Sequence, residues 1–249
     1  MKYIFANWKM YLDYKEAGEL AQNLAKADFD TSKVSLAVFP NTINFADSAK
    51  TFENTSIDVG AQAVNWTPQG AYTGAVSAHL FAQAGAKYAL VGHSERRHIF
   101  GETNEDIRKK VEACFDEGLV PVLCVGETKE DLEADRKDYR LKKQISKVFD
   151  GLDVSGKEIM VAYEPVWAIG GSGEGKPCTP DDADDVHGWI KEELKQYTKE
   201  SIPVLYGGSV KAENVLSYVE RDVIDGVLVG SASVKFGEFK NLISAAESL

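Results

Sequence analysis

The chain has 249 residues, of which 44% are hydrophobic and 27% are charged. This hydrophobic content excludes intrinsic disorder, and three cysteines are too few for a disulfide scaffold and are typical of a reducing compartment. The 28 basic and 39 acidic residues give a net charge of −11, which argues against nucleic-acid binding because such proteins need a basic surface.

Eight short apolar runs, rich in β-branched residues, are spaced along the chain. In order they cover residues 3–6, 34–39, 57–60, 88–92, 120–126, 159–163, 203–206 and 223–230. Because these runs are apolar on both faces, they are typical of strands buried in a parallel sheet. The sequence therefore predicts eight parallel strands.

Helix signals lie between the predicted strands. Apolar residues recur at helical spacing in three sets: Ala17, Leu20, Ala21 and Leu24; Ile107, Val111, Cys114 and Phe115; and Phe239, Leu242, Ile243 and Ala246. Cap signals open helices at Thr103 with Asp106, at Thr128 with Asp131, and at Thr179 followed by Pro180, Asp181 and Asp182. Strand and helix therefore alternate.

The alternation predicts the fold class. Eight strand–helix units over 249 residues give about 31 residues a unit, the size of a βαβ step, and no linker divides the chain. We expect an α/β protein in which residues 1–249 form a single (β/α)8 barrel. An open, doubly wound sheet is the alternative, but the first strand ends in Ala6-Asn7-Trp8-Lys9 instead of a glycine-rich dinucleotide fingerprint.

Other classes of site and location are disfavoured. No apolar run approaches the roughly 18 residues of a membrane span, and residues 1–10 lack the long apolar core of a signal peptide. We therefore expect a cytoplasmic protein without a membrane partner. The three cysteines lie far apart and no histidine pair has zinc-ligand spacing, so we expect no metal site.

In such barrels the active site lies at the carboxyl ends of the strands, where this chain carries several polar residues. The first strand ends in Asn7 and Lys9, which are two residues apart and therefore expected to share a face. The fourth ends in His93, followed by Ser94 and Glu95, and the sixth ends in Glu164. These side chains are the candidate catalytic residues.

Glu164 and His93 each have a functional and a structural interpretation. Glu164 stands between apolar residues, and partial desolvation would suit it to act as a base near neutrality; it could instead be a structural carboxylate paired to a buried cation. His93 could donate a proton or a hydrogen bond, or be a core histidine; a helix opened by Ser94-Glu95-Arg96 would disfavour positive charge on its ring.

The neighbouring charged residues have simpler interpretations. Lys9 either offsets an anionic substrate or is a solvated side chain at a strand end. We expect Glu95 and the pair Arg96-Arg97 to be local ion-pair partners.

Glycines after the last two strands indicate a phosphate site. Gly207-Gly208-Ser209 and Gly230-Ser231 would let backbone N–H groups approach an anion, with a following helix adding positive potential. Either turn alone could be a tight strand–helix connection, but barrels often bind phosphate after these two strands. The glycine-rich segment 168–178, which follows Glu164 closely, is either a lid over the site or a disordered connector.

Seven segments, in order and spacing, resemble the triosephosphate isomerase family along nearly the whole chain. They are Ala6-Asn7-Trp8-Lys9-Met10, Gly60-Ala61-Gln62, Tyr72-Thr73-Gly74, Val91-Gly92-His93-Ser94-Glu95-Arg96-Arg97, Ala162-Tyr163-Glu164-Pro165-Val166-Trp167-Ala168-Ile169-Gly170, Tyr206-Gly207-Gly208-Ser209-Val210 and Leu228-Val229-Gly230-Ser231-Ala232-Ser233. The resemblance implies a cofactor-independent isomerase of dihydroxyacetone phosphate and glyceraldehyde 3-phosphate in glycolysis and gluconeogenesis.

The resemblance also implies roles for individual residues. Glu164 would move the proton, neutral His93 would polarise the carbonyl, Lys9 and Asn7 would hold the substrate, and Glu95 would support the His93–Lys9 side. Phosphate would be bound by Gly170, Gly171, Ser209, Gly230 and Ser231. Thr73 would lie in a loop that inserts into the partner subunit of a homodimer. The lid departs from the family, because Ile169–Pro180 reads IGGSGEGKPCTP and is three residues longer than usual.

Two other functions fit a phosphate-binding barrel. A sugar-phosphate aldolase would need a Schiff-base lysine within a mid-barrel strand, and no predicted strand interior beyond the first contains a lysine; an amino-acid biosynthetic isomerase is a related alternative. A barrel retained as a binding scaffold would be expected to lack acid–base residues, yet Lys9, His93 and Glu164 are all present.

Overall fold

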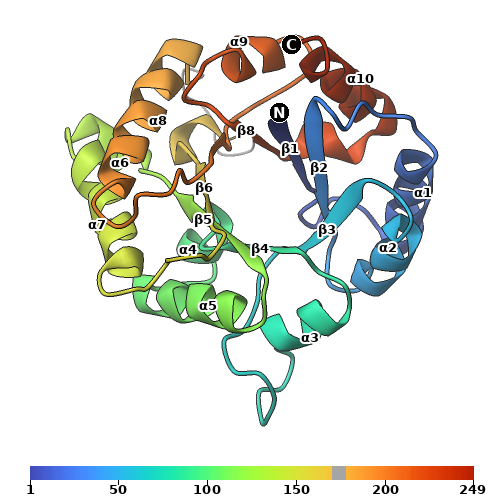
Figure 1. Ribbon diagram of the computed structural model, residues 1–249, viewed down its shortest axis with the longest axis horizontal. Helices are drawn as coiled ribbons and strands as arrows, with labels where there is room; N and C mark the ends of the chain where they lie inside the picture. Colours follow the sequence, from blue (N-terminus) through green and yellow to red (C-terminus); the bar gives the residue numbers. More distant parts are fainter. Residues whose placement is uncertain (170–177) are drawn as a thin grey trace.

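Eight parallel strands close into a barrel, in the order of the sequence, in the computed structural model of the chain (Figure 1). The structure describes residues 1–169 and 178–249. The strands are β1 (Lys2–Asn7), β2 (Val34–Phe39), β3 (Ile57–Ala61), β4 (Tyr88–Val91), β5 (Val120–Val125), β6 (Met160–Tyr163), β7 (Val204–Tyr206) and β8 (Gly226–Val229). Closure occurs between β1 and β8, where Tyr3 pairs with Gly226 and Ala6 with Val229. The predicted single-domain (β/α)8 barrel is confirmed, and the open-sheet alternative is wrong.

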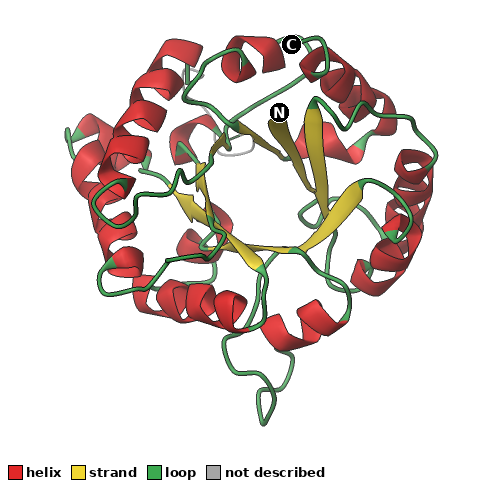
Figure 2. Cartoon of the chain, viewed as in Figure 1, coloured by secondary structure: helices red, strands yellow, loops and turns green. Residues whose placement is uncertain are grey.

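Helices form a ring outside the strands (Figure 2). In the described residues the α-helices are α1 (Tyr14–Ala25), α2 (Phe45–Phe52), α3 (Ala78–Gln83), α4 (Ser94–His98), α5 (Asn104–Asp116), α6 (Lys129–Glu133), α7 (Lys137–Phe149), α8 (Pro180–Leu194), α9 (Val215–Val219) and α10 (Phe236–Ala246). Two short 3₁₀ helices, η1 (Val166–Ala168) and η2 (Ser231–Val234), follow β6 and β8.

The predicted cap signals begin helices as expected. Thr103, Thr128 and Thr179 each cap a helix, α5, α6 and α8, and each forms a reciprocal capping box with the aspartate three residues later. A cap of this kind contributes about 1 kcal/mol to helix stability. The helix expected after Thr128 is two helices, because the chain turns at Asp135, which has a left-handed φ of 53°. The second of them, α7, carries no cap residue that the sequence could have revealed.

Strand alternation divides the core into two layers. Along β1, Phe5 points into the barrel, where its ring centroid lies 4.8 Å from that of Tyr88, whereas Ile4 and Ala6 pack toward the helices. Aromatic and aliphatic side chains from the other strands fill the remaining interior. Because the interior is packed, polar groups can gather only at the ends of the strands, and this fixes where a site can form. No helix in residues 1–169 and 178–249 is long and apolar enough to cross a membrane.

Candidate active site

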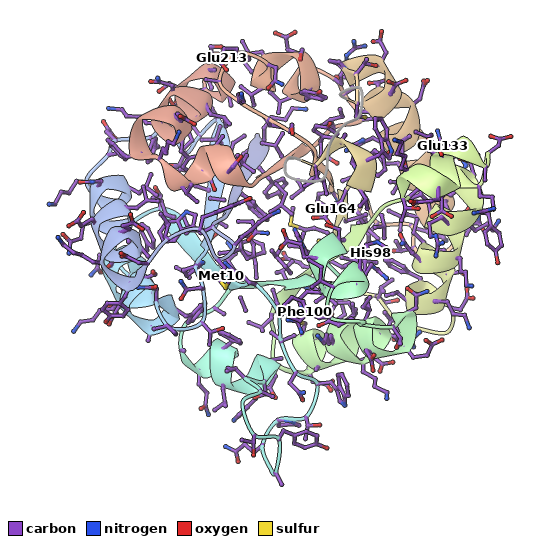
Figure 3. The ribbon with its side chains drawn as sticks, turned by 180° about the vertical axis from the view of Figure 1, so that it is seen from behind. Met10, His98, Phe100, Glu133, Glu164 and Glu213 are labelled. Carbon is purple, nitrogen blue, oxygen red and sulfur yellow. The ribbon has the colours of Figure 1, made fainter. Side chains whose placement is uncertain are left out.

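The carboxyl ends of the strands surround a cavity that contains most of the predicted site residues. Residues from β1 and the segment after it, the β4–α4 junction, the end of β6 and the turns after β7 and β8 line it. They are Asn7, Lys9, Tyr11, His93, Glu164, Ile169, Gly207, Gly208, Ser209, Val210, Lys211, Leu228, Gly230 and Ser231. Figure 3 shows Glu164 near the centre of the molecule, whereas Glu133 and Glu213 lie at its rim.

Glu164 is buried and held from two sides. Its side chain is 3% exposed, and its Oε1 lies 3.1 Å from His93 Nε2. The Ser94 backbone N–H donates to Oε2 at 2.8 Å, and the Glu164 backbone N–H donates to the Val125 carbonyl at 2.7 Å. The apolar flanks of Glu164 therefore do bury it, as the sequence indicated, and the hydrogen bond to Oε2 together with the His93 contact at Oε1 holds its orientation.

The hydrogen bonds of His93 define its tautomer. His93 is the N-cap of α4, and its Nδ1 accepts a hydrogen bond from the Glu95 backbone N–H at 3.2 Å. A ring nitrogen that accepts from a backbone amide carries no proton, so the proton of the neutral ring is on Nε2. His93 therefore has its protonated Nε2 beside the Glu164 carboxylate, in the wall of the cavity.

Lys9 and Asn7 face the same cavity for a reason that differs from the expected one. β1 ends at Asn7, and Lys9 lies beyond it with a left-handed φ of 49°, so strand alternation does not place Lys9. The Asn7 side-chain oxygen accepts from the Lys9 backbone N–H at 3.0 Å. Gln62 Nε2 donates to the Lys9 and Phe39 carbonyls at 2.8 and 2.9 Å. Gln62 thus stabilises the strained turn at Lys9. The sequence placed Gln62 in a segment that resembles the family but did not indicate this role.

The predicted ion pairs form around Glu95 and Arg96. Lys9 Nζ lies 2.8 Å from Glu95 Oε1, and Arg96 Nε lies 2.7 Å from Glu102 Oε1. Arg97 is different, and the expectation for it was wrong: no carboxylate of the described residues lies within ion-pair distance of its guanidinium, which donates to neutral acceptors instead.

The turns after β7 and β8 form one wall of the cavity, and the β7 turn begins against Glu164. A Cβ at Gly207 would lie 2.9 Å from Glu164 Cγ, so only glycine leaves room for the base. The Ser209 hydroxyl donates to the Ala168 carbonyl at 3.1 Å. η2 begins at Ser231, directly after Gly230, but α9 begins only at Val215. A helical segment therefore follows both turns, as expected, but only the one after β8 begins directly after the glycine.

Part of the predicted phosphate site, and most of the predicted lid, belong to a segment that the structure does not describe. Gly170 and Gly171 lie outside the described residues, as does the rest of segment 170–177. On its amino-terminal side, Trp167 Nε1 and the Tyr163 hydroxyl both donate to Glu127 Oε1, at 2.8 and 3.0 Å. Burial raises the pKa of the Glu127 carboxyl. Glu127 lies two residues after the end of β5, and this position near a strand end was the signal by which the sequence could have revealed it.

Cavity size alone does not identify the site. A cavity of about 210 Å³ lies at the opposite mouth of the barrel, between Tyr3, Tyr88 and Pro203, whereas the one beside Glu164 measures about 60 Å³. The larger cavity contains none of the predicted site residues. In the described part of the chain, no three His, Cys, Asp or Glu side chains gather as metal ligands would. The convergence of Lys9, His93 and Glu164 identifies the smaller cavity as the candidate active site.

Comparison with known proteins gives consistent matches over the whole chain. The family described as triosephosphate isomerase matches residues 2–246. The triosephosphate isomerase of Rubrobacter xylanophilus is 39% identical over 247 residues, which cover 97% of this chain and 95% of the relative. That of Aquifex aeolicus is 37% identical over 243 residues, covering 96% and 97%, and that of Francisella tularensis subsp. novicida is 35% identical over 252 residues, covering 100% and 98%.

Proposed function

This chain belongs to the triosephosphate isomerase family. From that premise we propose which residue acts as the base, which residues stabilise the developing charge and which bind the phosphate. The enzyme interconverts dihydroxyacetone phosphate and glyceraldehyde 3-phosphate in glycolysis and gluconeogenesis, as an intramolecular aldose–ketose isomerase. The observation that supports these roles is the contact of 3.1 Å between Glu164 Oε1 and His93 Nε2, in the cavity lined by the turns after β7 and β8.

Glu164 is the base that carries the proton between the two carbons. Its carboxylate takes the proton from the carbon next to the carbonyl; the C–H electron pair forms the C=C bond of an enediolate, and the carbonyl electrons move onto oxygen. Return of that proton to the former carbonyl carbon, together with transfer of the hydroxyl proton from the first oxygen to the former carbonyl oxygen, turns the first carbon into the new carbonyl and completes the isomerisation. The Ser94 N–H bond to Oε2 leaves Oε1 toward the cavity. A positioned carboxylate in a water-poor site is suited to this transfer.

His93 and Lys9 stabilise the oxygen charge that develops. The His93 Nε2–H, which lies beside Glu164, donates a hydrogen bond to a substrate oxygen when the substrate enters the cavity, and Lys9 supplies positive charge. Preorganised donors of this kind are usually the largest electrostatic contribution to catalysis. Asn7 holds the Lys9 backbone, and Glu95 holds both the Lys9 ammonium and, through its N–H, the His93 ring.

We propose that the phosphate group binds at the cavity wall formed by the turns after β7 and β8. Ser209, Gly230 and Ser231 line that wall, and Gly170 and Gly171 are assigned to the same anion on family resemblance. The direct test of the division of roles is the Glu164→Gln variant, with isomerisation and exchange of the C1 proton of dihydroxyacetone phosphate with solvent deuterium both measured. Loss of both activities together would support Glu164 as the one base.

We also propose that the enzyme acts as a homodimer in the cytoplasm. The loop between β3 and α3, which includes Thr73, projects from the barrel (Figure 1). Beside it a cavity of about 450 Å³ is lined by Trp66, Phe81 and Phe100, which could hold the Thr73 loop of a second copy. Exposed apolar side chains at Met10, Tyr72 and Ile99 support an interface. The free thiols of all three cysteines are consistent with a reducing compartment.

Replacing Phe100 with glutamate is expected to dissociate the dimer. An unpaired charge buried in an interface costs several kcal/mol, and the exposed Phe100 side chain lies where we place the partner's loop. Sedimentation velocity at micromolar concentration should show a monomer. Leu132→Glu is the matched control, since Leu132 is also exposed but lies on α6, outside this cavity, and should leave a dimer. Unchanged sedimentation of the Phe100 variant would refute this interface.

A further inference from the structure

Arg97 joins three segments of the site with one guanidinium. From α4, its Nε donates to the Gly92 carbonyl at 2.6 Å, Nη1 donates to Asn104 Oδ1 at 2.7 Å, and Nη2 donates to the Cys124 carbonyl at 2.9 Å. Gly92 lies at the end of β4, Asn104 begins α5, and Cys124 lies on β5. Only an arginine has a planar fork that can reach three acceptors in three directions.

Two of these acceptors are next to the groups that hold the base and its partner. Gly92 directly precedes His93. Cys124 precedes Val125, whose carbonyl accepts the Glu164 backbone N–H at 2.7 Å. A Cβ at Gly92 would lie 2.8 Å from Arg97 Nη2, and Gly92 has a left-handed φ of 73°. Arg97 therefore packs so tightly against Gly92 that no side chain fits at this position. Movement of the Arg97 side chain would therefore shift the backbone on both sides of the His93–Glu164 contact.

The charge of Arg97 is also exceptional. In the described ranges no carboxylate lies within ion-pair distance of it, although the adjacent Arg96 has Glu102. Burial lowers the pKa of Arg97 to about 10. The negative charge of Glu164 acts in the other direction and raises this pKa more than any other carboxylate does. Arg97, Cys124 and Glu164 line one narrow space that has no room for a water molecule. The positive charge of Arg97 therefore lies near the base and acts on it electrostatically.

We propose that Arg97 is a positioning residue of the isomerase: it braces the ends of β4 and β5 around Glu164, and its positive charge, which has no ion-pair partner among the described residues, adds to the positive potential at that carboxylate. This inference rests on the proposed role of Glu164 as the base. Arg97, which was expected to be a local ion-pair partner, is thereby assigned a function in setting the geometry and the charge of the site.

Other titratable and charged groups also act on Glu164. His93 lies at the end of β4, His98 and Arg97 lie on α4, Cys124 lies on β5, and Lys9 faces it across the cavity from the end of β1. Of these, Lys9 has Glu95 as a counter-charge, and burial raises the pKa of the Cys124 thiol well above its usual range, so that it stays neutral. Arg97 is therefore the cation whose loss should change the charge balance behind the base.

Arg97→Met and Arg97→Lys separate the two parts of the proposal. Methionine removes both the fork and the charge, so kcat/KM should fall about 100-fold. The acid limb of its pH profile should move upward by about one pH unit, because the carboxylate loses a nearby cation. Lysine keeps the charge but cannot span three acceptors, so kcat/KM should fall about tenfold while the acid limb stays in place. If the methionine variant does not fold, Arg97→Gln replaces it, because glutamine also removes the charge and its amide can still donate to one of the carbonyls; the lysine variant tests the brace in either case.

Arg108→Met is the matched control. Arg108 Nη1 also donates to backbone carbonyls, those of Val148 and Asp150, but far from the cavity. Its loss should lower Tm and leave the pH profile unchanged. The proposal is overturned if Arg97 variants lose only Tm, if Arg97→Met keeps the wild-type acid limb, or if kcat/KM of Arg97→Lys stays within twofold of wild type. Activity retained by Glu164→Gln would overturn the assignment of the base itself.

Discussion

Replacing Glu164 with glutamine should lower kcat by about 10⁴-fold, the upper end of what a general base contributes. The amide is isosteric with the carboxylate, and its oxygen can still accept the Ser94 N–H, so the site should keep its shape. Glu164→Asp retains a base but withdraws it by roughly 1 Å, and kcat should fall about 100-fold. In both variants KM should change much less than kcat, because the base acts mainly in the transition state.

The matched control for Glu164 is Glu193→Gln. Glu193 is also a buried glutamate, but it lies on α8 with its carboxylate 3.5 Å from Lys142, outside the cavity. Its loss should leave kcat unchanged and lower only stability. A coupled assay on the three purified variants measures these effects. A Glu164→Gln enzyme that kept more than about 10% of wild-type kcat would not need a general base at this position.

Replacing Lys9 with methionine should lower kcat/KM by about 10³-fold, which corresponds to roughly 4 kcal/mol of transition-state stabilisation. The protein carries a net charge of −11, and in the described lining of the cavity only Lys9 and Lys211 are lysines or arginines. An anionic substrate therefore depends on few positive charges, and Lys9, with its side chain 11% exposed, is the one nearest the β1 end. Both kcat and KM should suffer, since the phosphate and the enediolate are anionic.

Stability should be nearly unaffected by the same change. The partner of Lys9, Glu95, has a side chain that is 42% exposed, so losing the ion pair leaves a solvated carboxylate and costs less than about 1 kcal/mol. Lys15→Met, at an exposed position on α1, removes one positive charge in the same way and should leave kcat/KM unchanged. Steady-state kinetics and thermal unfolding distinguish the cases. A Lys9→Met enzyme within tenfold of wild-type kcat/KM would contradict a direct role of this charge.

The barrel was predictable because each strand has a local sequence signal, an apolar run, and this signal recurs eight times along the chain. Each strand is an apolar run that must be buried on both faces, and the observed strands begin and end within three residues of the expected positions. The helices with a capping box, such as α5 and α8, were equally visible. Helices without such a signal, α2 and α9, have N-caps whose side chains make no capping hydrogen bond. Tertiary packing, which has no local signature, determines where they begin.

The sequence predicted most of the residues that form the site, but few of the interactions that hold them in place. Strand ends indicated Asn7, His93 and Glu164 because parallel strands direct their carboxyl ends to one edge. The left-handed turn at Lys9 and the support from Gln62 depend on contacts between distant segments. Arg97 stands beside Arg96 in the sequence, yet one pairs with a carboxylate and the other with backbone carbonyls. Which acceptor a long side chain reaches is decided in three dimensions.

The most direct test of the account is a crystal structure with 2-phosphoglycolate, whose carboxylate resembles the two oxygens of the enediolate. We predict that its phosphate binds against the turns at Gly207–Ser209 and Gly230–Ser231, and that its carboxylate lies between Glu164, His93 and Lys9. A complex in which the phosphate binds elsewhere, or in which the Glu164 carboxyl turns away from the ligand into the barrel wall, would contradict the account.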